Sequence, residues 1–138
     1  MPQGFTLLDD TLDVPLAAGC LFDVVGLGFD IQPHPQLQIE VQSSTWCGEI
    51  IFDYPVSFRA HDEAEIIDYW VARAAEDGGV GTFFRIEKSD YLLELSQGVS
   101  GLHNQELNHY LVAGLDLCVE IISTSLPTAE WKRSDKVV

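Results

Sequence analysis

The sequence predicts an α+β domain in which a mainly antiparallel sheet of about six to eight strands packs one amphipathic helix against its apolar face. Three observations support this fold class: several segments alternate apolar and polar residues, one segment has a capped helical pattern, and short turn sequences join neighbouring strands. The length of 138 residues suits one domain with a single core. We assign residues 1–131 to this domain and expect residues 132–138 to form a mobile tail.

The first 59 residues predict strands. Residues 5–8 and 20–31 are strand-like, and Gly26 and Gly28 within the second segment are typical of a bulge or a bend. Residues 37–41 alternate as a half-buried strand does, and residues 43–45 provide a turn. A long strand follows at 46–59, with its even-numbered side chains in the core and Pro55 at a sheet edge or bulge.

The helix is expected to begin at Asp62, which can cap the first turn together with Glu65, and to end at residues 77–79. Its apolar stripe comprises Ile66, Ile67, Trp70, Val71 and Ala74. Residues 82–88 and 91–96 then predict one hairpin, and residues 106–112 and 115–123 a second. A helix around 104–112 is the alternative for the first strand of the second hairpin. Beyond Pro127 we expect no regular structure.

The chain is strongly acidic, with a formal charge of -15 and an apolar fraction of 46%. Residues 1–58 contain eight carboxylates and no lysine or arginine, and residues 1–131 contain 21 acidic and four basic side chains. A field of this sign repels nucleic acid and anionic membranes and attracts basic proteins. The three cysteines are far apart and form no C-x-x-C pair, so we expect buried thiols. The sequence contains no recognisable signal or membrane-spanning segment, and we expect a cytoplasmic protein.

Strand alternation places seven carboxylates on the side opposite the core, and these are the predicted partner-binding residues: Glu40, Glu49, Asp53, Glu87, Glu94, Asp116 and Glu120. Apolar side chains such as Ile51 and Ile122 share this parity. A mixture of carboxylates and apolar groups is typical of a recognition surface. A solvated sheet face, or a face covered by the amino-terminal strands, is the alternative interpretation.

No catalytic motif is complete. The Gly26-Leu27-Gly28 segment lacks the third glycine of a dinucleotide-binding fingerprint because Ile31 occupies that position, and residues 98–101 do not form a G-x-S-x-G elbow. We therefore predict no enzyme, no catalytic residue and no cofactor. The best metal candidate is the set His103, Glu106 and His109, which converges only if this stretch is helical, so we expect two partly exposed histidines and no metal site.

The order of elements from Leu37 onward resembles that of small acidic immunity proteins of bacterial toxin systems, including the WapI-type group. The similarity lies in a strand, the Trp46-Cys47-Gly48 step, a second strand, an Asp-led helix over 62–75 and paired hairpins. The chain departs from the group after the last strand, where residues 123–131 replace a polar-aromatic segment. The resemblance implies a cytoplasmic, non-enzymatic protein that binds and neutralises a cognate toxin, often a basic one.

The leading hypothesis is a non-enzymatic acidic binding protein, an immunity or inhibitor protein that neutralises a basic partner such as a toxin. It includes no nucleic-acid and no membrane partner. A second hypothesis is a small enzyme or ligand-binding domain that uses His103, Glu106 and His109, with or without a metal. A third is a structural or assembly subunit that pairs exposed strand edges. The sequence leaves the oligomeric state open.

Overall fold

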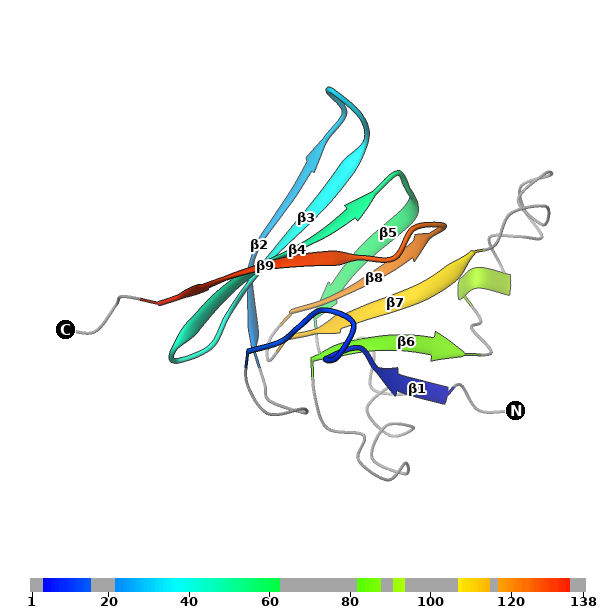
Figure 1. Cartoon of the computed structure of the whole chain (residues 1–138). Coiled ribbons are helices and arrows are strands. Elements are labelled where there is room, and N and C mark those ends of the chain that lie inside the picture. The colour runs from blue at the N-terminus through cyan, green and yellow to red at the C-terminus, as the bar shows by residue number, and fades with distance from the viewer. Residues whose placement is uncertain are drawn as a thin grey trace.

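The computed structural model describes residues 4–15, 22–62, 82–87, 91–93, 107–114 and 117–134, which form two antiparallel β-sheets packed face to face (Figure 1). The predicted α+β class is therefore wrong, since about two thirds of the described structure is antiparallel strand and it contains no helix of seven or more residues. A second sheet, rather than a helix, covers the apolar face of the first. Asp62 is the last residue of a strand (Pro55–Asp62) and not the expected helix cap, and the rest of the predicted helix lies outside the described residues.

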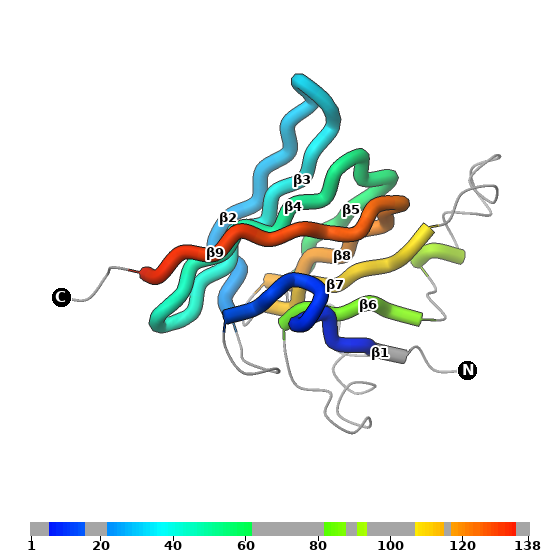
Figure 2. Tube along the Cα trace, in the orientation of Figure 1, coloured from blue at the N-terminus to red at the C-terminus, as the bar shows by residue number. Residues whose placement is uncertain are grey.

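The described residues form nine strands, and strands that follow one another in the chain do not always belong to the same sheet. The five-stranded sheet has the order β1 (Gly4–Leu7), β6 (Phe83–Glu87), β7 (Asn108–Ala113), β8 (Leu117–Ser123) and β5 (Pro55–Asp62). The four-stranded sheet has the order β2 (Asp23–Asp30), β3 (Gln36–Gln42), β4 (Trp46–Asp53) and β9 (Thr128–Arg133). Figure 2 shows the β2–β3 hairpin extending beyond the rest of the sandwich.

The predicted long strand over 46–59 is two strands that belong to different sheets. The break falls at Tyr54, whose φ of 52° is in the left-handed region that a non-glycine residue seldom adopts. Its N–H donates to the carbonyl of Pro35 at 2.8 Å, which holds the reversal in place. Pro55 then begins β5 at the edge of its sheet, with a register shift between Pro55 and Ser57, so the prediction for this proline is confirmed.

The carboxyl-terminal part contains a strand that was not expected. Strand β9 pairs with β4 and extends through Arg133, so residues 132 and 133 are not a tail. Trp131 lies directly opposite Gly48, where a side chain on the glycine would overlap the indole ring. The indole nitrogen Nε1 also donates to the carbonyl of Leu12 at 2.9 Å. The tryptophan therefore connects β9 to both the sheet and the amino-terminal loop.

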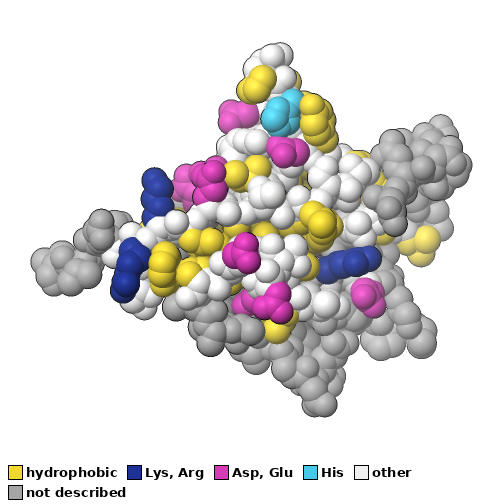
Figure 3. Space-filling view, viewed as in Figure 1, with side chains coloured by type: hydrophobic (Ala, Val, Ile, Leu, Met, Phe, Trp, Pro, Cys, Tyr) yellow, Lys and Arg dark blue, Asp and Glu magenta, His cyan; other side chains and the backbone are white. Residues whose placement is uncertain are grey.

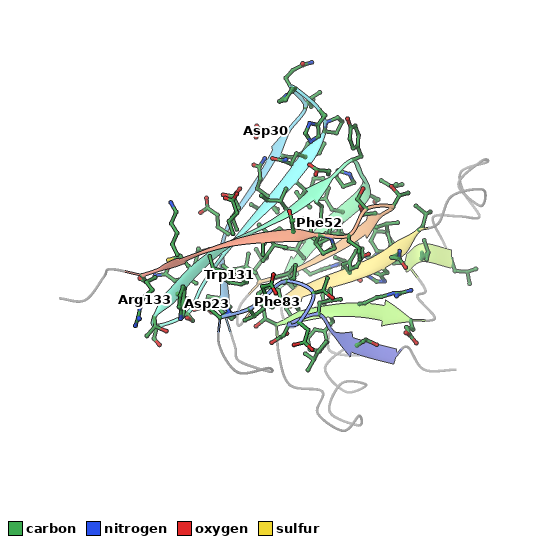
Figure 4. All side chains as sticks on the ribbon, viewed as in Figure 1. Asp23, Asp30, Phe52, Phe83, Trp131 and Arg133 are labelled. Carbon is green, nitrogen blue, oxygen red and sulfur yellow. The ribbon has the colours of Figure 1, made fainter. Side chains whose placement is uncertain are left out.

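The core lies between the two sheets. Its aromatic centre is formed by Phe22, Phe83 and Trp131, whose ring centroids are 5.4 to 5.9 Å apart. Figure 4 labels Phe83 and Trp131. Rings at these separations make favourable tilted and edge contacts. The buried aliphatic side chains around them come from both sheets and from the amino-terminal loop: Leu8, Leu12, Leu37, Ile39, Val41, Ile50, Val112, Val119 and Ile121.

The five-stranded sheet is buried on both faces along β7 and β8. These two strands confirm the second predicted hairpin, and the alternative helix is not found from Asn108 onward. The first strand of the first predicted hairpin is β6, but residues 91–93 of its second strand form a helical turn instead, and residues 94–96 lie outside the described residues. No helix within the described segments has the length and apolar character needed to cross a membrane.

Candidate functional site: the acidic face of the four-stranded sheet

The seven predicted partner-binding carboxylates do not share one face. Glu40, Glu49 and Asp53 lie on the outward side of the four-stranded sheet, because Leu37, Ile39 and Val41 on β3 point inward. Glu87 is exposed on β6 of the other sheet. Glu120 lies on β8 and is fully buried, contrary to the expected exposure. Glu94 and Asp116 lie outside the described residues.

Cross-strand register extends the outward carboxylates of the four-stranded sheet beyond those predicted. Asp23 pairs with Gln42, Asp30 with Gln36, and Glu130 with Glu49, and partners in register share a face. We call this surface the acidic face and define it by six carboxylates and one lysine: Asp23, Asp30, Glu40, Glu49, Asp53, Glu130 and Lys132. Figure 3 shows several Asp and Glu side chains over this sheet and others elsewhere on the visible face.

Three glutamates form a row across the centre of the acidic face. Glu49 on β4 lies directly opposite Glu40 on β3 and Glu130 on β9. Within the described residues none of the three forms an ion pair. Like charges directly opposite one another destabilise a sheet. The row therefore concentrates negative charge at a cost in folding stability.

A shallow groove of about 500 Å³ follows the glutamate row. Its walls include the three glutamates, Lys132 and the half-buried thiol of Cys47. On the β2 side of the row, the Glu40 carboxylate lies over Gly26. A Cβ atom added to this glycine would be 2.8 Å from Glu40 Oε2. The groove can accommodate the stem and head of a cationic side chain.

Asp53 closes the upper end of the acidic face beside the β2–β3 hairpin. Hydrogen bonds from Gln36 Nε2 at 2.9 Å and from the His34 ring at 2.7 Å lower the pKa of Asp53 below its usual value. The His34 ring in turn stacks on Tyr54 at a centroid distance of 5.0 Å. Two side-chain hydrogen bonds therefore hold the Asp53 carboxylate in place, whereas no ion pair within the described residues holds the glutamates of the row.

Glu120 belongs to a second, separate cluster on the outward side of the five-stranded sheet. Its Oε2 accepts a hydrogen bond from Arg59 Nε at 2.7 Å and lies 2.6 Å from His61 Nε2. Its Oε1 lies 2.9 Å from His109 Nε2. The Arg59 guanidinium also lies 3.8 Å from the centre of the Tyr91 ring, and the Tyr91 hydroxyl contacts Ser57 Oγ.

Both oxygens of Glu120 thus have basic or imidazole partners, as a buried carboxylate requires. The partners come from β5 and β7, the two strands that flank β8. The cluster therefore joins three strands. Since its carboxylate is buried and engaged on both oxygens, we assign it to the fold and not to the capture of a partner.

Sequence reasoning missed Asp23, Asp30 and Glu130. Glu130 was overlooked because residues 128–133 were not recognised as a strand, although Ala129 and Trp131 alternate there with polar residues. Asp23 and Asp30 lie at the two ends of β2 (Figure 4), and register places both on the outward side, although the Oδ1 atom of Asp23 is buried. The sequence does not predict which side of the sheet these two aspartates occupy, because Gly26 and Gly28 interrupt the alternation of apolar and polar residues between them.

The predicted metal set is only partly within the described structure. His103 and Glu106 lie outside it, whereas His109 is buried on β7 beside Glu120. In the part of the chain that the structure describes, no three metal-ligating side chains come together.

No protein-family model matches the chain, and no curated protein or solved structure is significantly similar to it.

Proposed function

We propose that this protein is a non-enzymatic binding protein whose acidic face captures a basic protein. One observation carries the proposal: Glu40, Glu49 and Glu130 lie in register across three strands, with no ion pair among the described residues. A basic partner would relieve their mutual repulsion, so part of the free energy stored in the folded protein becomes available for binding.

The electrostatics of the whole chain support the same proposal. The formal charge of -15 steers cationic proteins toward the surface, and the groove beside the glutamate row gives them a place to dock. Association should therefore be fast at low ionic strength and slow markedly as salt rises. We propose as the biological role that of an immunity or inhibitor protein, which neutralises a basic toxin in the cytoplasm.

The test uses blocked lysine- and arginine-rich peptides as probes, with glutamate-rich peptides of the same length as a counter-probe. The triple variant Glu40→Gln, Glu49→Gln, Glu130→Gln should bind the cationic probes at least about tenfold more weakly than the unmodified protein. Fluorescence anisotropy at several salt concentrations measures both the affinity and its ionic-strength dependence.

The control is a second triple variant with the same change in net charge. Asp10→Asn, Asp13→Asn and Glu87→Gln neutralise three exposed carboxylates outside the acidic face. This variant should lose less than about threefold in affinity. Equal losses in the two triple variants would show that net charge alone attracts the probes and would contradict the proposal.

A further inference from the structure

The two edges of the four-stranded sheet differ in their protection against pairing with another chain. Strand β9 presents the exposed charged side chains Glu130, Lys132 and Arg133, which discourage such pairing. Strand β2 has eight residues and no lysine, arginine or proline. Its exposed large side chains are apolar instead: Val25, Leu27 and Phe29. An edge of this composition is a template for strand addition.

The inward side of β2 extends past the core. Leu27 and Phe29 face the same way as the buried Ile39 and Leu37 beside them, yet they are 42% and 45% exposed. We call Leu27 and Phe29 the apolar strip of β2. The ring of Phe29 contacts Phe58 at a centroid distance of 5.4 Å, but the rest of the apolar strip is exposed to solvent. An added strand would bury the strip if its own inward side chains were apolar.

The outward side of β2 has the opposite chemistry. Gly26 and Gly28 carry no side chains there, and the Glu40 and Gln38 side chains of β3 lie over them. Asp30 ends the strand and accepts a hydrogen bond from Gln38 Nε2 at 3.0 Å. A long cationic side chain on a neighbouring strand can therefore pass over the glycines and reach Glu40 or Asp30.

We propose that β2 pairs with an extended segment of the basic partner, in which lysine or arginine alternates with apolar residues. The alternation follows from strand geometry, because successive side chains of the added strand point to opposite faces. Its apolar residues cover Leu27 and Phe29, and its basic residues face Glu40 and Asp30. The bulge at Val25 confines regular pairing to Gly26–Asp30. This inference rests on the proposed function and specifies how the acidic face recognises its partner.

The test compares two blocked peptides of identical composition, each long enough to span β2. In one, lysine and valine alternate; in the other, the lysines and valines form separate blocks. The alternating peptide should bind at least about tenfold more tightly. Amide hydrogen exchange should slow in β2 when the alternating peptide is added, because new backbone hydrogen bonds form there.

Two lysine variants locate the site. Leu27→Lys places a cation on the apolar strip of β2, and Thr128→Lys adds the same charge to an exposed position of β9. Thermal unfolding checks that both variants fold. Leu27→Lys should weaken the alternating peptide at least about tenfold, whereas Thr128→Lys should weaken it less than about threefold.

Equal affinity for the two peptides, or equal losses in the two lysine variants, would overturn strand addition. If the glutamate triple variant still weakened both peptides, the proposed function would stand without this inference. Sedimentation of the protein alone supplies another decisive outcome. A dimer that Leu27→Lys abolishes would show that a second copy occupies β2, and the proposed basic segment would be wrong.

Discussion

The outward sides of the two sheets each carry a glutamate within the same Cys-x-Glu-Ile-Ile sequence, at residues 47–51 and 118–122, but the two glutamates have opposite surroundings. On β8, Glu120 lies opposite Arg59, and its carboxylate is buried. On β4, Glu49 lies opposite two further glutamates, and the resulting row lines a groove. The residue opposite in register therefore decides whether a strand carboxylate stabilises the fold or is available to a partner.

The largest expected effect is the loss of the buried cluster. Glu120→Gln removes the buried carboxylate charge that pairs with Arg59, and we expect the free energy of unfolding to fall by about 3 kcal/mol. This is the lower end for a broken buried pair, since the Arg59 side chain is 40% exposed and regains water. Urea denaturation measures the change. Glu87→Gln, at an exposed position of β6, should change stability by less than about 0.5 kcal/mol. Similar values for the two variants would contradict the assigned role of Glu120.

A smaller effect of opposite sign is expected in the glutamate row. Glu49→Gln removes the central charge between Glu40 and Glu130, so the repulsion on both sides disappears. The protein should become more stable by about 0.2–1 kcal/mol at low salt, and the gain should shrink as salt is added. Urea denaturation at two ionic strengths tests this expectation. Destabilisation by Glu49→Gln would mean that the row has partners that favour its charge.

The smallest effect concerns acid stability at Asp53. Its hydrogen bonds lower the pKa in the folded protein below the usual 3.8, so the ionised form is favoured by native contacts. The resulting stabilisation is fully present above pH 3.8 and disappears as the pH falls through the lowered folded value. Asp53→Asn should therefore flatten the pH dependence of the urea midpoint between about pH 5 and pH 2. Parallel curves for the variant and the unmodified protein would contradict this.

Most strands were predictable, because apolar and polar residues alternate along β3 and β4, and mostly apolar runs flank the turn of the β7–β8 hairpin. The second sheet, which covers the apolar face of the first, was not predictable. Alternation shows that one face of a strand is buried, but it does not show whether a helix or a sheet covers that face. The break at Tyr54 was also missed. A single backbone reversal there sends β4 and β5 to different sheets while the alternation continues through it.

The candidate site was predictable only in part. Parity identified Glu40, Glu49 and Asp53 as outward, and the structure places all three on the acidic face. Strand alternation also predicted that Glu120 faces solvent. This was wrong because the five-stranded sheet is buried on both faces along its central strands. The glutamate row itself depends on which strands are neighbours, and β4 and β9 are far apart in the sequence. Such long-range pairing leaves no local signature.

The pairing of β4 with β9 also delays completion of the four-stranded sheet during synthesis of the chain. The ribosome must add the 74 residues from 54 to 127 before the last strand of this sheet begins to form, which takes about 4–15 s at roughly 5–20 residues per second. Throughout that interval the nascent chain has β4 without the neighbour that supplies Trp131. We expect chaperones that bind apolar strand edges to engage the emerging polypeptide during this window.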